Sequence, residues 1–420
     1  MHTIVLNRNS SQNLWEQIKN ICDAKSLIIF TSKEKQSKDC EIYNAKIEGI
    51  VKKLFIVKNY DRSWNLEHIL HSYLSKENIK ISSVFAIAEY DLFRASKIRE
   101  YYKISGFTLE QTSLFRNKII MKNYLVKHNI KVAPYKKVDS LYDIYGFQES
   151  YGFPLIFKYQ EAGGAVGIQV LKDFEDIEKF SFEILASQSF EWPKMMVEKF
   201  VFGTMYHVDG LVNKNKVLYN VANKYINQGI AYLDGLSLGS IILDENDEIS
   251  KRLIELNKQI IKILPITEAY GFHNEFFIDK QGEIVLCEIT ARVGGGAINN
   301  QNTILKDVNM VKTLLEKTIN PNQDIKISSK NMSKSGGHIY FTTGTKKGKI
   351  TRLPPKCPYD YVKYYKLNTE LGNIINPSVS CMNNLATIIF EAEDENEAEK
   401  RLKILEKWFE NNKEIAYAGE

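Results

Sequence analysis

Two glutamates on a predicted β-hairpin are the strongest chemical signal in the chain. Glu275 and Glu288 lie in β-rich segments on either side of a polar turn at 279–282, which is typical of a tight strand connection. A symmetric closure at this turn places Glu275 opposite Leu286, with Glu288 diagonal to it on the same face. Two facing carboxylates repel, and the pKa of one rises unless a cation lies between them. Because oxygen ligands on a rigid hairpin suit Mg²⁺, the pair predicts a magnesium site.

The residues that follow the second glutamate suit an anionic substrate. Thr290 and Arg292 share the face of Glu288 if the strand continues, and glycines 294–296 end it. A fixed cation beside a glycine loop can hold an anion or a transferring phosphoryl group. The alternative is a solvated face with unrelated acids, which the apolar character of 284–289 disfavours because a bare buried glutamate is costly.

Three single residues near these segments have two interpretations each. His273 precedes Glu275 by two residues and shares its face, so it is a candidate for contact with substrate; the alternative is a packed core histidine. Glu89 follows the fourth predicted strand, and the carboxyl ends of parallel strands face ligand crevices; the alternative is an acid at a helix N-terminus. Cys287 alternates away from the glutamates and is expected in the core.

A second glycine-rich segment, 163–167, lies between predicted strands at 155–158 and 169–171. Several backbone N–H groups of such a loop can converge on one anion, because the missing side chains allow close approach. Lys158 lies at the strand end and would add a point charge. The alternative is a glycine hairpin with a surface lysine. The Walker pattern G-x-x-x-x-G-K-[ST] is absent, so the loop is not of that type.

The elements that position these residues fall into distinct parts. Over the first hundred residues, short apolar runs alternate with helical spacings, which indicates a parallel α/β sheet. These runs lie at 4–6, 27–30, 54–57 and 84–87. No G-x-G-x-x-G follows the first run, so we expect no dinucleotide site there.

The remainder of the chain predicts a helix at 115–127 and mainly β-hairpins from 155 to 290, with a long helix at 249–264. A polar stretch at 320–324 is a predicted linker to a small α+β unit. The final helix of that unit places four apolar residues on one face, namely Ala398, Leu402, Leu405 and Trp408.

The composition is that of a globular protein. The 420 residues suggest about three domains, and 44% hydrophobic with 25% charged residues exclude a disordered chain. The net charge of +5, with no basic block among aromatics, argues against a nucleic-acid partner. Five scattered cysteines without a C-x-x-C pair argue against disulfides or zinc and favour a reducing compartment. With no signal peptide and no apolar run of about 20 residues, we expect a cytoplasmic protein without a membrane partner.

Together these segments resemble the ATP-grasp superfamily, in particular its carboxylate–amine ligases and the L-amino-acid ligases. The resemblance covers nearly the whole chain and implies an α/β and α+β protein. Its ATP-grasp fold would have an N-terminal Rossmann-like pre-domain and a small C-terminal α+β domain. The implied divisions are a pre-domain at 1–112, an ATP-grasp domain at 113–320 with its lid at about 113–200 and its metal-binding core at about 201–320, and a C-terminal domain at 321–420.

The resemblance also gives roles to individual residues. Those implied in ATP binding are Lys118, Lys158, Gly163, Gly164, Ala165, Gly167, Glu198, Lys199, Phe200, Val201 and His207. The implied metal ligands, for one or two Mg²⁺ ions with Mn²⁺ as a substitute, are Glu275, Glu288 and Thr290. Arg292 and Lys158 are the implied catalytic residues, and substrate binding would fall to Arg292, Gly295, Gly296, His273 and Glu89.

Three positions depart from the family pattern. Met205 stands where many members have an acid for the ribose, which leaves His207 or Asp209 as substitutes. Thr290 replaces the usual asparagine ligand and is a weaker oxygen donor. Ala165 stands where serine is common in the glycine loop, although backbone donors could still serve.

The resemblance implies a ligase that uses ATP and Mg²⁺ to convert an amino-acid carboxylate to an acyl phosphate and releases ADP. The acceptor stays open between an amine, which gives a dipeptide when a second amino acid supplies it, and the phosphopantetheine thiol of an acyl carrier protein. The second case resembles the glutamate ligase of butirosin assembly and implies antibiotic biosynthesis. Two further alternatives are an ATP-binding module without catalysis and a carboxylase that uses bicarbonate. A homodimer also stays open.

Overall fold

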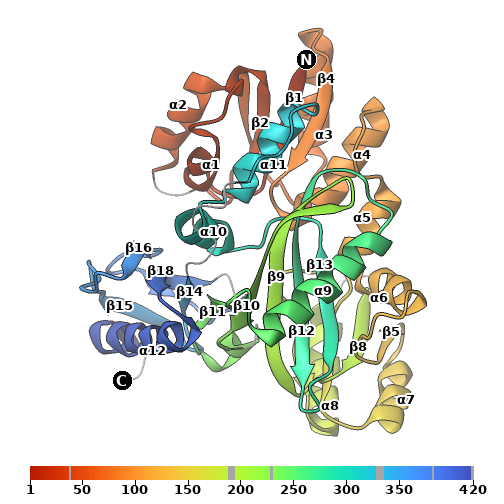
Figure 1. The fold of residues 1–420 in the computed structure, drawn as a ribbon, viewed down its shortest axis with the longest axis vertical. Helices are drawn as coiled ribbons and strands as arrows, with labels where there is room; N and C mark the ends of the chain where they lie inside the picture. Colours follow the sequence, from red (N-terminus) through yellow and green to blue (C-terminus); the bar gives the residue numbers. More distant parts are fainter. Residues whose placement is uncertain (37–38, 188–193, 228–229, 328–334, 381–382, 418–420) are drawn as a thin grey trace.

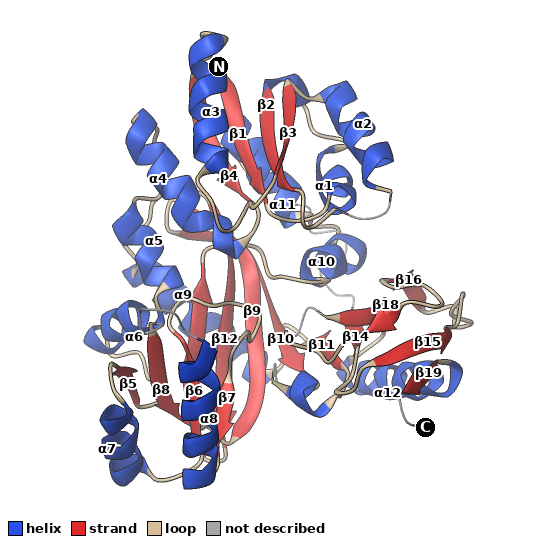
Figure 2. Ribbon diagram, turned by 180° about the vertical axis from the view of Figure 1, so that it is seen from behind, coloured by secondary structure: helices blue, strands red, loops and turns tan. Residues whose placement is uncertain are grey.

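The computed structural model describes residues 1–36, 39–187, 194–227, 230–327, 335–380 and 383–417. An N-terminal α/β unit lies at one end of the molecule, above a long central sheet (Figure 1). A smaller sheet lies beside the lower part of the central sheet, and the C-terminal strands and helix extend to the other side (Figure 2). This mixed α/β architecture confirms the predicted fold class.

The N-terminal unit is the predicted parallel sheet, in the strand order β3-β2-β1-β4. Both faces are covered, because Ile4 and Leu6 belong to one core cluster while Val5 belongs to another. The strands are β1 (His2–Asn7), β2 (Leu27–Ser32), β3 (Lys53–Val57) and β4 (Ile81–Ala86). The helices between and after them are α1 (Ser11–Ile18), α2 (Cys40–Ile50), α3 (Asn65–Lys76) and α4 (Leu92–Tyr102).

The prediction of one helix at 115–127 is wrong, because two helices meet at Asn117. The first, α5, spans Leu109–Arg116, and the second, α6, spans Lys118–Lys127. Asn117 has an extended backbone, and its side chain accepts hydrogen bonds from the backbone N–H groups of Ile119 and Ile120. An asparagine at this position stabilises the start of a helix by satisfying N–H groups that have no partner within it.

The smaller sheet follows, with the antiparallel order β5-β8-β6-β7. Its strands are β5 (Tyr135–Val138), β6 (Leu155–Tyr159), β7 (Gln169–Leu171) and β8 (Met195–Lys199). The helices α7 (Leu141–Tyr151) and α8 (Phe174–Ser187) belong to the same part of the chain. The glycine segment 163–167 connects β6 to β7, as the sequence predicts.

The central sheet has eight strands in the order β13-β12-β9-β10-β11-β14-β18-β16. They are β9 (Gly203–Asn213), β10 (Lys216–Tyr225), β11 (Leu238–Ile242), β12 (Tyr270–Asp279), β13 (Ile284–Thr290), β14 (Ser335–Thr342), β16 (Val362–Leu367) and β18 (Asn384–Ala392). The pairing of β11 with β14 continues the sheet into the C-terminal part of the chain. The predicted long helix is α9 (Glu248–Ile263), whose buried Leu253 and Ile260 pack on one face of the sheet.

The C-terminal part adds a three-stranded sheet of β15 (Gly348–Arg352), β17 (Ile374–Ile375) and β19 (Glu414–Tyr417), together with α12 (Glu395–Asn412). The face of α12 is buried at Ala398, Leu402 and Leu405 as predicted, but Phe409 takes the fourth buried position and Trp408 is only partly covered. Two further helices, α10 (Ile298–Lys306) and α11 (Met310–Ile319), follow β13, and α11 packs against the N-terminal sheet.

The predicted register of the glutamate hairpin is wrong by two residues. The turn is longer than a symmetric closure, since Ile278 pairs with Ile284. A β-bulge between Glu275 and Phe276 then shifts the register again, so that Glu275 lies directly opposite Glu288. A bulge adds one residue to one strand of a pair.

Cys287 is the extra residue at this bulge, and it lines the cavity beside the glutamates instead of the core. Its predicted core position is therefore wrong. Cys22, Cys40, Cys287 and Cys357 are free thiols, while Cys381 lies outside the described residues. No helix in the described part of the chain has the length and apolar character needed to cross a bilayer.

Truncating the buried face of α12 should destabilise the protein. Leu402 is fully buried against β14 and β18, so Leu402→Ala should lower the free energy of unfolding by about 2–5 kcal/mol. Urea denaturation followed by tryptophan fluorescence checks this, because Trp408 lies in the same helix. The exposed neighbour Lys403 is the control, and Lys403→Ala should change the value by less than about 0.5 kcal/mol. Equal stability of the two variants would contradict the packing of α12.

Candidate functional site

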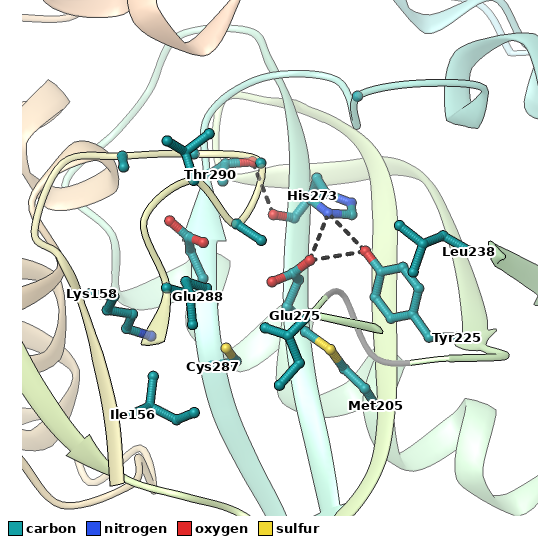
Figure 3. Close-up of a pocket in the computed structure, with 18 of the residues that line it drawn as sticks. Ile156, Lys158, Met205, Tyr225, Leu238, His273, Glu275, Cys287, Glu288 and Thr290 are labelled. Carbon is teal, nitrogen blue, oxygen red and sulfur yellow. Dashed lines mark hydrogen bonds and ion pairs between the residues drawn. The ribbon is translucent and has the colours of Figure 1, made fainter. Parts of the chain in front are cut away.

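One cavity is lined by nearly all the site residues that the sequence predicts. It lies between the smaller sheet, the central sheet and the loop after β13, and Figure 3 shows its glutamates facing the interior. The predicted site residues that line it are Glu89, Lys118, Lys158, Gly163, Gly164, Ala165, Glu198, Lys199, Phe200, Val201, His273, Glu275, Glu288, Thr290, Arg292, Gly295 and Gly296. Gly167 and His207 are the two that it does not include.

Adjacent strands β6 and β8 bring Lys158 and Glu198 together at one end of the cavity. The Nζ atom of Lys158 lies 2.5 Å from Oε1 of Glu198, and Nζ of Lys122 lies 3.2 Å from Oε2. Burial raises the pKa of Glu198, but the two lysines outweigh it and hold the pKa at about 2. The Glu198 side chain is thus held by two buried lysines in the wall of the cavity.

Lys122 is a functional candidate that the sequence analysis missed. It is fully buried on α6, one helical turn after Lys118. The i, i+4 spacing places both lysines on the same helix face, and this spacing could have signalled the pair.

The same end of the cavity has apolar walls, formed by Ile156, Phe200, Val201, Met205 and Phe277.

The glycine loop lies over the cavity and is held there by side chains. Lys118 donates to the carbonyl oxygen of Ala162 at 2.8 Å, and it also lies 2.7 Å from Oε1 of Glu288. Gly163 lies against Glu89, where a Cβ atom would come within 2.8 Å of Oε2. Gly167 does not line the cavity, but a glycine is favoured there because its φ is +71° and a Cβ would meet the ring of Tyr159.

Glu275 and Glu288 face the cavity from neighbouring strands (Figure 3). Tyr225 donates its hydroxyl to Oε1 of Glu275 at 2.9 Å, and Nε2 of His273 lies 3.3 Å from the same atom. Burial raises the pKa of Glu275, but the hydrogen bond and charge of His273 lower it well below the usual range. Tyr225 and His273 thus contact Oε1 of Glu275, and Lys118 contacts Oε1 of Glu288. Among the described residues, neither Oε2 atom has a hydrogen-bond partner.

The donor set therefore fits a hard divalent cation. Two free carboxylate oxygens on paired strands offer the ligand type that Mg²⁺ prefers. Thr290 lies on the same wall, and its hydroxyl donates to the carbonyl oxygen of His273 at 2.9 Å. That hydrogen bond uses the proton of Thr290 and leaves its oxygen able to act as a further ligand.

Arg292 is held by an acid from the N-terminal unit. Its Nε and Nη2 atoms lie 3.0 and 2.7 Å from Oε2 of Glu89, and Arg116 pairs with the other oxygen. Burial raises the pKa of Glu89, but the two arginines and Lys118 lower it well below the usual range. Glu89 is thus a fixed anion that orients Arg292 in the cavity wall.

His207 lies on the same face of β9 as Met205 but does not reach the cavity. It is fully buried, with Nδ1 2.6 Å from Oδ2 of Asp209. The ring of Tyr225 covers it, with ring centroids 4.5 Å apart. The expectation that His207 or Asp209 contacts a ribose is not met, because both side chains are enclosed by this cluster.

The far end of the cavity was not predicted. It lies beside Arg292 and is formed by strands β10, β11 and β14, by residues that follow β10 and by the first residue of α10. These residues share no motif, and only the sheet brings them together. They are Tyr225, Asn227, Ile230, Leu238, Gly239, Ile298, His338 and Tyr340.

Comparison with known proteins gives this arrangement a family. Residues 117–214 match the family described as the carbamoyl-phosphate synthase L chain, ATP binding domain. The chain is 26% identical over 339 residues to an L-arginine-specific L-amino acid ligase from Bacillus subtilis. The matched region covers 78% of this chain and 79% of the relative. The chain is an ATP-grasp ligase that resembles the L-amino-acid ligases.

Solved structures agree with this fold. The L-amino acid ligase from Bacillus licheniformis superposes with a TM-score of 0.75 at 13% identity, over 100% of this chain and 99% of the other. The biotin carboxylase domain of the Hydrogenobacter thermophilus 2-oxoglutarate carboxylase, solved with MgADP, ADP and bicarbonate, gives a TM-score of 0.69 at 14% identity, over 99% and 90% of the two chains. At these identities the superpositions show the ligase's fold and leave its substrates open.

Removing the lysine of β6 should weaken nucleotide binding. Lys158→Met deletes a buried cation from the cavity wall, so the affinity for a non-hydrolysable ATP analogue should fall about 10- to 100-fold. Isothermal titration calorimetry measures this. Lys194→Met, which changes an exposed lysine next to β8, is the control and should bind like the unchanged protein. Unaltered affinity in Lys158→Met would contradict a role for this end of the cavity.

Proposed function

We propose that this ATP-grasp ligase joins the carboxyl group of one amino acid to the amine of another and forms ADP. The main supporting observation is that a single cavity holds Lys118, Lys158, the paired Glu275 and Glu288, and Arg292. Cations for phosphates, ligands for Mg²⁺ and an arginine for an acyl phosphate are then within reach of one substrate. The two bacterial L-amino acid ligases support the same reaction by their names.

In the first proposed step, a carboxylate oxygen of the substrate attacks the γ-phosphorus of ATP and ADP leaves, which gives an acyl phosphate. Lys118 and Lys158 bind phosphate oxygens and balance the developing charge. Glu275, Glu288 and Thr290 would hold Mg²⁺, which when bound would supply further neutralisation of the phosphoryl group. The apolar walls beside β8 accept the adenine, whose polar edge contacts the backbone of 198–201.

In the second proposed step, the amine nitrogen attacks the acyl carbon and inorganic phosphate leaves, which forms the amide. Arg292 holds the phosphate oxygens during this exchange. Water must stay out, because it would hydrolyse the acyl phosphate. The closed glycine loop serves this purpose, and Tyr232 and Ser380 support it by donating to the carbonyl oxygens of Ala165 and Gly164, each at 2.9 Å.

The lining of the far end of the cavity suits an apolar substrate side chain. Ile230, Leu238, Ile298 and Tyr340 form its walls. The described residues that form this end include no acid, and Glu89, which holds the neighbouring Arg292, is already neutralised by two arginines. An arginine substrate would need a free carboxylate, so we propose that this chain differs in preference from its L-arginine-specific relative.

We also propose the division of the chain into a pre-domain at 1–112, an ATP-binding part at 113–320 and a C-terminal part at 321–420. The core clusters support it, since one cluster of the N-terminal sheet draws only on residues before 113, and α12 covers a cluster formed mainly by the C-terminal part. The C-terminal part would close the far end of the cavity with His338 and Tyr340 from β14.

A product assay tests the proposed reaction. The protein is incubated with Mg-ATP, an amino-acid panel that includes leucine, phenylalanine, arginine and glutamate, and hydroxylamine. We expect ADP and an amino-acid hydroxamate, because hydroxylamine traps an acyl phosphate. Release of AMP and pyrophosphate would contradict the proposal, as would nucleotide binding without turnover on any carboxylate. ADP release that depends on bicarbonate would indicate a carboxylase.

The acceptor is settled by a parallel measurement. With two amino acids and no hydroxylamine, we expect a dipeptide by mass spectrometry. Mass gain on a phosphopantetheine-bearing carrier protein, with no dipeptide, would instead support thiol transfer as in glutamate loading for antibiotic biosynthesis.

Glu288→Gln should remove ligase turnover, because it deletes one carboxylate of the proposed cation site while keeping the shape of the side chain. We expect the rate of ADP release to fall at least about 100-fold. Glu283→Gln, in the exposed turn of the same hairpin, is the matched control and should retain the normal rate. Near-normal turnover in Glu288→Gln would refute the role of the paired glutamates.

A further inference from the structure

A buried cluster lies directly behind Glu275. Asp209 is fully buried on β9, the strand next to β12. One of its oxygens lies 2.8 Å from Nδ1 of His273, and the other lies 2.6 Å from Nδ1 of His207. On its other side, Nε2 of His273 reaches Oε1 of Glu275 at 3.3 Å.

The geometry of this cluster is that of hydrogen bonds. A zinc ion with ligands at about 2.0–2.1 Å in tetrahedral geometry would separate its ligand atoms by about 3.3 Å. The observed 2.6 and 2.8 Å are too short for that, but they fit N–H groups that donate to a carboxylate. The two ring nitrogens of His273 lie within hydrogen-bonding distance of Asp209 and Glu275, so His273 links the two acids.

Asp209 is itself held in place from a third direction. Asn223 donates to its Oδ2 atom at 3.4 Å, and Gln301 donates to Asn223 at 2.9 Å. The amide oxygen Oε1 of Gln301 lies 2.6 Å from Nδ1 of His338, which lines the far end of the cavity. The cluster is thus part of a polar network that links the far end of the cavity to Glu275.

Two donors therefore fix one oxygen of Glu275. Tyr225 and His273 both address Oε1 (Figure 3), and the free Oε2 atom faces the cavity between Glu275 and Glu288. A carboxylate bound in this way has one rotamer and one available oxygen. Groups that hydrogen-bond to a metal ligand raise metal affinity by orienting it.

We propose that Tyr225, His273 and Asp209 are positioning residues that hold Glu275 ready to bind the divalent cation. This inference rests on the proposed function, because it takes Glu275 as a ligand. None of the three needs to touch the cation or the nucleotide for the effect. It also explains why a histidine and an aspartate are buried together on the cavity side of these strands, while Phe272 and Phe276 belong to a core cluster that includes residues of α9.

Cation binding in the ADP complex tests the proposal without turnover. Free Mn²⁺ is counted by electron paramagnetic resonance while the ion is titrated into protein and ADP. Tyr225→Phe and His273→Gln should each lower the Mn²⁺ affinity by about 10-fold or more. Their affinity for ADP in EDTA should stay within about twofold of the unchanged protein, since the effect passes through the metal ligand.

Tyr124→Phe is the matched control. Its hydroxyl donates to a backbone carbonyl at the end of α9, so it loses the same atom far from the cation. Asp209→Asn tests whether the aspartate behind His273 also contributes to Mn²⁺ affinity. If Asp209→Asn prevents folding, the result for Tyr225→Phe decides whether Glu275 is positioned in this way.

Each outcome has one meaning. Mn²⁺ affinities within about twofold of the control would overturn the positioning role, as would an equal loss of ADP affinity in EDTA. If the unchanged protein with ADP binds no Mn²⁺, the cation site of the proposed function fails instead.

Discussion

The cavity depends on the neutralisation of four acids that line it. A carboxylate with little access to water is costly unless a cation or several donors compensate its charge. Three of the four are paired with cations on other elements, so these pairs also join parts of the fold, while Glu275 is paired with His273 of its own strand and accepts a hydrogen bond from Tyr225 on β10. The pairs are Glu89 with Arg116 and Arg292, Glu198 with Lys122 and Lys158, Glu275 with His273, and Glu288 with Lys118.

This balance couples the nucleotide to the metal. The two lysines proposed for phosphates are already engaged, Lys118 with Glu288 and Lys158 with Glu198. A polyphosphate that draws Lys118 toward itself leaves Glu288 opposite Glu275 with less compensation. A divalent cation between the two glutamates restores it. Glu198 is less affected, because Lys122 stays with it. Nucleotide and cation should therefore favour each other's binding, and linkage makes this effect reciprocal.

Much of the fold follows from local pattern. The apolar runs of the first hundred residues predict strands that are buried on both faces. The spacing of apolar residues over 249–264 predicts a helix that is buried along one stripe. The break at Asn117 is less visible, since the residues on both sides favour a helix. Of the site, the glutamates, Lys158 and Arg292 were predictable because their chemistry needs those residue types at those spacings.

The remainder of the site depends on contacts between distant segments. His207 lies on the predicted face, but the ring of Tyr225 from the next strand covers it. Glu89 reaches Arg292 across 203 residues of sequence. The residues of the far end, such as Leu238 and Tyr340, come from strands whose pairing is set by the whole sheet. No local period encodes such neighbours.

The hairpin register shows how two deviations can preserve a functional face. A one-residue slip moves every side chain of a strand to the other face. The longer turn alone would pair Glu275 with Cys287 and turn Glu288 away. The bulge at Cys287 adds a second slip, which returns Glu288 to the cavity while Phe276 and Leu286 stay paired in the core. The extra residue faces the site as a thiol whose pKa burial raises to about 12. It therefore stays neutral, and it adds no charge where every acid already needs a partner.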